Sequence, residues 1–328
     1  MKNGIKSEDV SVVIQGPVDS YTKKSIDSIR KHLPDSEIIL STWNGSNTNG
    51  LDYDLLVLNE DPGASYFDPK NKILLNINRW IVSSNNGVKS ATKKYVLKCR
   101  SDVIMTSTNF LSYWNSFEKT DINYFTFRHK VMIPSLYTLK YIGDNNGHSA
   151  MPMPFHISDW YCFGLREDVL LLTDCKIIPD LDGFSKYFEN KYVPVEYRWW
   201  IDNWLRKMAP EQYIGLSLAK RVIDDIDIVD AVTLENIDEY MVDKFMVSNF
   251  IILDPKQFGL LNGKYEMISK YPLLSDSNVI AGMYLFKKYK NTYDHIFSKV
   301  KQKRYKNRIN KLYWTLKDVK SKLRNVYN

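Results

Sequence analysis

The residues best suited to chemistry in this chain are carboxylates next to turns. Asp102 closes the short turn Arg100-Ser101-Asp102, which follows the apolar run 95–97. An aspartate just past the carboxyl end of a strand lies at the open edge of an α/β sheet, where ligands bind, and there it can hold a hard divalent cation. Ser101 is placed to position a phosphate or a water. The alternative for Asp102 is a solvated turn or a helix N-cap.

Two other carboxylates are candidate general bases. Asp159 lies in the segment HISDW, residues 156–160, and packing against Trp160 and Phe163 would remove water and raise its pKa toward values useful for proton transfer. Glu211 begins a predicted helix, where an acidic side chain also simply complements the helix dipole. The sequence leaves both residues as candidates.

The elements that must position Asp102 lie within residues 76–105. Apolar or small residues recur there at a roughly helical spacing, and residues 95–97 have the composition of a buried strand. The helical stripe consists of Ile77, Ile81, Val88 and Ala91. We therefore expect a helix that leads into a strand ending at the acidic turn.

The same alternation of strands and helices is expected upstream. Strands at 11–15, 37–42 and 54–59 each end in turns rich in Gly, Pro or Asn, and apolar residues follow the first strand at helical spacing. This order predicts βαβ units in a Rossmann-like α/β fold with a mixed, mainly parallel sheet flanked by helices. Neither GxGxxG nor GxxxxGK[ST] is present, which disfavours dinucleotide and P-loop chemistry.

Downstream of Asp102 the pattern is less regular. The expected elements are, in order, a helix over 109–117, a strand over 123–128, a polar region punctuated by Gly and Pro over 132–153, a turn at Gly164, a helix from about Glu167, amphipathic helices over 199–207 and 211–221, and mixed short elements over 224–286. We expect one domain over 1–223, with 224–286 packed on it and a basic helix over 287–328.

Composition limits the class of protein. A chain of 328 residues with 44% hydrophobic content can bury a sizeable core. No window approaches the roughly 18 apolar residues of a membrane span, and the N-terminus lacks an apolar signal segment, so we expect a cytoplasmic location. Cys99, Cys162 and Cys175 are too few and too far apart for a disulfide framework or a zinc cage, and free thiols are expected.

Positive charge is concentrated at the C-terminus. Residues 287–324 hold fourteen Lys or Arg and two Asp, a net charge of +12, so the rest of the chain carries about −5 of the total +7. An apolar stripe runs along this segment through Tyr305, Ile309, Leu312, Leu316, Val319, Leu323 and Val326. The stripe predicts a long helix that docks on its own domain, lies on an anionic membrane surface, or forms a coiled coil.

Five motifs are spread over residues 11 to about 215: IQGPV, STWNG, LNEDPG, NINR…G…A…YVLKCRSD and HISDW…FG. Together they resemble the bacterial WavE lipopolysaccharide synthesis family. The resemblance implies a GT-A type glycosyltransferase that moves a sugar from a nucleoside diphosphate sugar, with UDP favoured, to a cell-surface polysaccharide such as lipopolysaccharide or capsule. In the common GT-A pattern the strand ends in Asp-x-Asp, but here Arg100 takes the first acidic position and only Asp102 remains.

This chemistry assigns roles to the candidate residues. Glycosyl transfer releases a diphosphate whose charge must be neutralised, and an inverting enzyme must also deprotonate the acceptor hydroxyl. The resemblance therefore implies Asp102 as the ligand of Mn²⁺ or Mg²⁺, and Asp159 or Glu211 as the base of an inverting reaction. The expected nucleotide-sugar-binding residues are Gln15, Gly16, Pro17, Thr42, Trp43, Arg79, Ser101 and Asp102, and the expected acceptor-binding residues are His156 and Trp160.

Two alternatives predict different features. A nucleotidyltransferase acting on a sugar phosphate needs an Arg/Lys-rich glycine loop after the first strand, where only Gln15-Gly16-Pro17 stands. A nucleic-acid-binding protein using the basic tail needs basic residues elsewhere too, but the remaining chain is net acidic. We therefore expect a nucleotide sugar, a lipid-linked or oligosaccharide acceptor and an anionic membrane surface as partners, no nucleic acid, and a peripheral position on the inner face of the plasma membrane.

Overall fold

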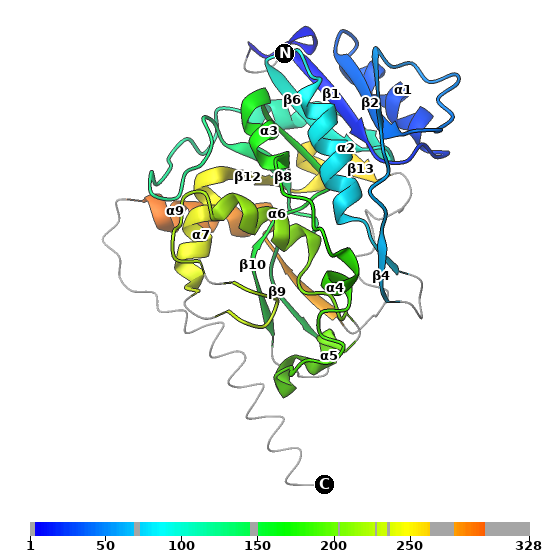
Figure 1. The fold of residues 1–328 in the computed structure, drawn as a ribbon. Coiled ribbons are helices and arrows are strands. Elements are labelled where there is room, and N and C mark those ends of the chain that lie inside the picture. Colours follow the sequence, from blue (N-terminus) through cyan, green and yellow to red (C-terminus); the bar gives the residue numbers. More distant parts are fainter. Residues whose placement is uncertain are drawn as a thin grey trace, which may run out of the picture.

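A seven-stranded mixed sheet forms the centre of the molecule (Figure 1). The computed structural model describes residues 4–298 except 69–72, 145–149, 203, 227, 235–236 and 263–278. The strand order is β12-β8-β11-β6-β1-β2-β3, and every neighbouring pair is parallel except the two pairs made by β11. These strands are β1 (Val10–Gln15), β2 (Glu37–Trp43), β3 (Leu55–Asn59), β6 (Tyr95–Arg100), β8 (Val131–Pro134), β11 (Tyr161–Leu165) and β12 (Phe250–Leu253). The predicted mixed, mainly parallel α/β sheet is confirmed.

Helices cover both faces of this sheet because the central strands are apolar on both sides. All six residues of β1 are buried. Val13 belongs to the same buried cluster as Ile81 of α2 (Ile77–Lys89), whereas Ile14 shares the other cluster with Ile26 of α1 (Thr22–His32). Successive residues of a strand point to opposite faces, so α1 and α2 pack on opposite sides. The predicted strands and helices of the first hundred residues are confirmed to within a few residues.

Gly87 allows α2 to approach the sheet closely. A Cβ atom at this position would lie 2.5 Å from Cγ1 of Val13 and 2.9 Å from Cβ of Ser41. The hydroxyl of Ser41 donates a 2.7 Å hydrogen bond to the carbonyl of Ser83 in the same helix. The absence of a side chain at Gly87 therefore fixes the depth at which α2 sits over β1 and β2, and with it the position of the strand that follows.

The second half of the chain departs from several predictions. Residues 123–128 form turns instead of a strand, and the helix predicted over 109–117 is a 3-10 turn, η3 (Asn109–Tyr113). The supposed polar region over 132–153 contains β8, β9 (Leu139–Asp144) and the start of β10 (Met151–His156). Its Gly and Pro residues suggested loops, but its apolar residues are buried by contacts far away in sequence. Gly164 lies inside β11, against Val131 and Val169, instead of at a turn.

Smaller elements complete the fold. A second sheet has the order β10-β9-β14, and two strand pairs join β4 with β5 and β7 with β13. Their bounds are β4 (Ser65–Asp68), β5 (Ile73–Leu75), β7 (Val103–Met105), β13 (Leu260–Asn262) and β14 (Val279–Met283). The other helices are η2 (Ser7–Asp9), α3 (Arg166–Thr173), α4 (Leu181–Ser185), η4 (Val195–Tyr197), α5 (Arg198–Ile201), α6 (Pro210–Ala219), α7 (Glu239–Asn249), α8 (Pro255–Phe258) and α9 (Phe286–Phe297).

The predicted helices of the C-terminal half are partly confirmed. α6 begins at Pro210, one residue before the start of the helix predicted over 211–221. The helix predicted over 199–207 is limited to the single turn of α5. α9 begins the basic segment, and the predicted stripe from Tyr305 to Val326 lies outside the described residues. Within the described part of the chain, no helix is both long and apolar enough to cross a bilayer. The three cysteines are free thiols, as predicted.

Candidate active site

The carboxyl ends of β1 and β6 bring several predicted residues together. Arg100, the last residue of β6, is paired with Gln15, the last residue of β1. The backbone N–H of Ser101 donates to the carbonyl of Gln15 at 3.0 Å, and its hydroxyl donates to the carbonyl of Pro17 at 2.7 Å. Gly16 has a φ of +116°, in a region that favours glycine, which lets the chain turn here. Four residues predicted to bind the nucleotide sugar therefore share one sheet edge.

Arg100 and Asp102 form an ion pair at this edge. The guanidinium donates through Nε to Oδ1 of Asp102 at 3.0 Å and through Nη2 to Oδ2 at 2.7 Å. The carbon of the same guanidinium lies 5.0 Å from the centre of the Trp160 ring. Asp102 is buried, whereas the side chain of Arg100 keeps 30% of its surface exposed. The pair is thus held from two sides and remains open to solvent through its arginine.

The carboxylate of Asp102 does not fit the predicted divalent cation. A hard cation held by protein needs carboxylate or carbonyl oxygens directed at it, but both oxygens of Asp102 accept hydrogen bonds from Arg100. Among the described residues, no group of three or more His, Cys, Asp or Glu is arranged to hold a metal ion. The positive group beside Asp102 is therefore a guanidinium.

Asp159 is held next to this edge by hydrogen bonds to its backbone carbonyl. Its carbonyl accepts hydrogen bonds from Nζ of Lys98 at 2.6 Å and from Nε1 of Trp80 at 2.9 Å. The ammonium of Lys98 also lies 4.6 Å from the centre of the Trp80 ring. Trp80 comes from the first turn of α2 and Lys98 from the middle of β6, so the two elements predicted to position Asp102 position Asp159 as well.

Burial and neighbouring charges shift the proton affinity of these groups. Burial, with a smaller contribution from Glu211, raises the pKa of Asp159 to about 6, while Lys98 and Arg100 oppose the rise. Burial lowers the pKa of Lys98 to about 8. Asp159 therefore titrates near the range in which a carboxylate can accept a proton from a substrate and release it again.

The buried His156 lies next to Glu211, which is half-buried. Nδ1 of His156 lies 2.9 Å from the carbonyl oxygen of Tyr137, and Nε2 lies 3.9 Å from Oε2 of Glu211. Burial lowers the pKa of His156 to about 3, so the ring is neutral, and its proton belongs on Nδ1, where the carbonyl accepts it. Burial raises the pKa of Glu211, whereas the positive charges of Arg206 and Arg100 lower it. His156 therefore presents a proton acceptor to Glu211.

The other predicted residues lie farther along the edge. Arg79 donates to both carboxylate oxygens of Asp61 at 2.7 Å, and this pairing raises the pKa of Arg79. One turn later in α2, the hydroxyl of Ser83 donates to Oε1 of Gln15 at 2.8 Å. Thr42 is buried and its hydroxyl lies 3.1 Å from that of Ser46, while Trp43 ends β2 opposite Asn59 of β3. The predicted residues thus extend from β11 to the β2–β3 side of the sheet.

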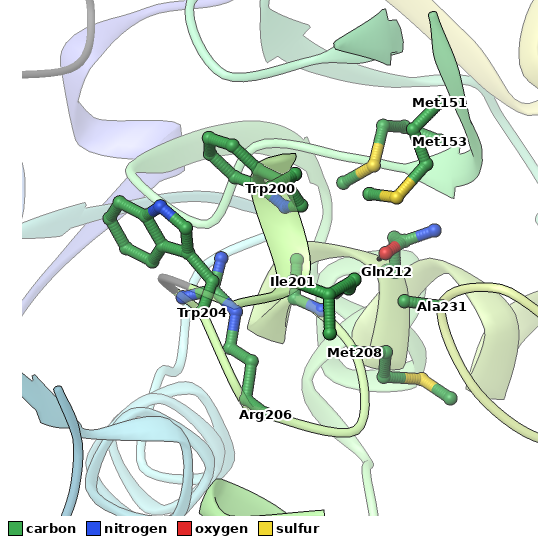
Figure 2. Close-up of a pocket in the computed structure, with 10 residues that line it drawn as sticks. Met151, Met153, Trp200, Ile201, Trp204, Arg206, Met208, Gln212 and Ala231 are labelled. Carbon is green, nitrogen blue, oxygen red and sulfur yellow. Dashed lines mark hydrogen bonds between the residues drawn. The ribbon is translucent and has the colours of Figure 1, made fainter. Parts of the chain in front are cut away.

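A hollow is lined by residues of α5, β10 and the start of α6 (Figure 2). One lining residue, Arg206, interacts electrostatically with Glu211. The rings of Trp200 and Trp204 stack with centroids 5.0 Å apart, and the guanidinium carbon of Arg206 lies 5.0 Å from the Trp204 ring. The lining residues are Met151, Met153, Trp200, Ile201, Trp204, Arg206, Met208, Ala209, Gln212 and Ala231. His156 and Trp160, the predicted acceptor-binding residues, are buried and do not line it.

Three important residues, Lys98, Trp80 and Arg206, were not singled out from the sequence. The one available signal is Lys98, a charged residue in the middle of the otherwise apolar strand segment YVLKC. A lysine there must either face solvent or be buried with polar partners, and the structure shows the second arrangement. Nothing local to the sequence indicates that Trp80 and the carbonyl of Asp159 are those partners.

Comparison with known protein families identifies the family of this chain. No curated protein matches the chain. The family model described as WavE lipopolysaccharide synthesis matches residues 10–321, which include every element of the sheet edge described above. Because the match spans nearly the whole sequence, the chain belongs to the WavE lipopolysaccharide synthesis family.

Proposed function

We propose that the protein is a glycosyltransferase of lipopolysaccharide biosynthesis that uses a nucleoside diphosphate sugar, with UDP favoured, and inverts the anomeric centre. One observation carries the proposal: Asp159 is held at the ligand-binding edge of the sheet by Lys98 and Trp80, and its pKa is raised to about 6. Membership of the family provides the biosynthetic setting.

The reaction assigns Asp159 the role of general base. An acceptor hydroxyl gives its proton to the Asp159 carboxylate while its oxygen forms a bond to the anomeric carbon of the donor. The bond from that carbon to the diphosphate oxygen breaks on the opposite side, and its electron pair leaves with the nucleoside diphosphate. A base is effective when its pKa lies near the working pH. Glu211 is the second candidate, and we assign it the role of raising the proton affinity of Asp159.

Neighbouring residues suit the remaining parts of the substrates. We assign the edge formed by Gln15, Gly16 and Ser101 to the nucleotide, and Arg79 lies on the helix that contacts Gln15. The acceptor would approach from the side of the hollow in Figure 2, which Gln212 of α6 and Arg206 line. Peripheral binding of the basic segment 287–328 to an anionic membrane would bring a lipid-linked acceptor within reach, and this part of the proposal rests on its net charge.

Nucleotide release from a panel of UDP-, GDP-, CMP- and TDP-sugars tests the proposal. We expect one donor to be consumed in the presence of a lipopolysaccharide or oligosaccharide acceptor. Asp159→Asn should reduce kcat by about 100-fold or more, since general base catalysis contributes about that much, without changing the affinity for the donor. Asp225→Asn, an exposed aspartate, is the matched control. Wild-type turnover by Asp159→Asn would exclude this residue as the base.

A further inference from the structure

We propose that Arg100 binds the diphosphate of the donor directly, and that donor binding requires no divalent cation. The inference rests on the proposed function and adds the ligand class of one residue. Arg100 ends β6 beside Gln15 and next to the antiparallel strand β11, so its side chain stands at the edge where the parallel strands terminate. Ligands of α/β sheets bind at this edge.

The guanidinium is already oriented for such a ligand. Asp102 accepts from Nε and Nη2, which fixes the plane of the group, and the Trp160 ring lies 5.0 Å from its carbon. A planar guanidinium binds phosphate through paired N–H donors, and less entropy is lost when the group is held in place beforehand. The side chain is 30% exposed, so an incoming anion can reach it.

The same contacts oppose metal binding at Asp102. A cation would have to replace Arg100 at both carboxylate oxygens of a residue that is 4% exposed. Displacing Arg100 would break both charge-assisted hydrogen bonds of the pair. Asp102 would supply such a cation with one carboxylate, so water and substrate phosphates would have to provide its remaining oxygen ligands.

The surrounding charges favour an anion near Arg100. Lys98 and Arg100 both lower the pKa of Asp159, and Arg206 and Arg100 both lower that of Glu211, so three cationic side chains lie around the two acids. Burial raises the pKa of each acid, against the effect of these cations. A diphosphate would therefore meet the guanidinium of Arg100 with two further cationic side chains nearby.

Calorimetric binding of UDP, GDP and CDP to the full chain tests the inference, with each titration done in EDTA and again in Mn²⁺. We expect one nucleotide to bind with the same Kd in both buffers, within about twofold. Arg100→Ala should weaken that binding by about 10- to 150-fold, the range for hydrogen bonds to charged groups, and Arg100→Lys should weaken it less. Arg128→Ala, which removes an exposed arginine outside the site, is the control and should bind like the wild type.

Wild-type binding that is lost in EDTA and restored by Mn²⁺ would overturn the inference and leave the proposed function intact. Binding of no nucleotide under any condition would overturn both. Arg100→Asp places carboxylates at positions 100 and 102, so we expect its nucleotide binding to require Mn²⁺. Metal-independent binding by this variant with wild-type affinity would show that Arg100 is not the diphosphate ligand. Near-wild-type circular dichroism for Arg100→Lys would establish that the comparison is made on folded protein.

Discussion

Replacing Lys98 by methionine is expected to shift the pH dependence of the reaction upward. Nζ of Lys98 donates to the carbonyl of Asp159 at 2.6 Å, and its charge lowers the pKa of the Asp159 carboxyl, which burial raises to about 6. Methionine has nearly the same shape and no charge. Because a nearby opposite charge lowers the pKa of an aspartate by about 1–3, the variant should have an Asp159 pKa of about 7 or higher.

The variant Lys98→Met should lose activity at low pH, because the base acts only in its ionised form. Asp159 accepts a proton only when ionised, so activity should fall as the pH drops through its pKa, near 6 in the wild type. With a pKa of about 7 in Lys98→Met, the ionised fraction at pH 6 falls from about one half to about one tenth. The variant should therefore be about fivefold slower than the wild type at pH 6 and should approach it above pH 8.5.

Initial rates of nucleotide release, measured as kcat/KM from pH 5 to 9, provide the assay. Urea unfolding of both proteins at each pH controls for the loss of the buried ammonium. If the acid limb stays at the same pH in Lys98→Met, Lys98 does not act on the base. If the fall in kcat/KM at low pH is also present in the residual activity of Asp159→Asn, it is caused by another group, and Asp159 is not the base.

Three other perturbations have definite expected results. Glu211→Gln removes a charge that raises the pKa of Asp159, so the acid limb of kcat/KM should move below pH 6. Lys130 is buried, and burial lowers the pKa of its ammonium to about 7. Because the unfolded chain holds this proton to higher pH, the free energy of unfolding should rise between about pH 7 and 10.5. In urea unfolding, the rise from pH 7 to 9.5 should be about 3 kcal/mol smaller in Lys130→Met than in the wild type. Gly87→Ala should lower stability by about 1–3 kcal/mol in thermal unfolding, because its new Cβ meets Val13 at 2.5 Å.

The sheet edge could be predicted from sequence because its signals are local. The strand ending at Gln15 and the helix and strand of 76–105 show clear periodicity, and parallel strands place their carboxyl ends together. The strands within 132–153 could not be predicted, because Pro and Gly interrupt them and their burial depends on β11, β12 and β14, which come later in the chain.

The contacts of the site residues are of two kinds, local in the sequence or between residues far apart in it. Arg100 and Asp102 flank Ser101 at a turn, so the contact between them is local in the sequence. The hydrogen bonds of Lys98 to Asp159 and of His156 to Tyr137 join residues 61 and 19 positions apart. Only the folded chain specifies those contacts.

The spacing along β6 relates the proposed base to the proposed diphosphate ligand. Val96, Lys98 and Arg100 alternate onto the face of β6 that α2 covers, as shown by the pairing of Val13 with Lys98 and of Gln15 with Arg100. Val96 belongs to the core, Lys98 holds the backbone of Asp159, and Arg100 holds Asp102 at the edge. Lys98 and Arg100 are one strand repeat apart, about 7 Å along β6. One strand therefore carries both the residue that holds the backbone of the proposed base and the proposed diphosphate ligand.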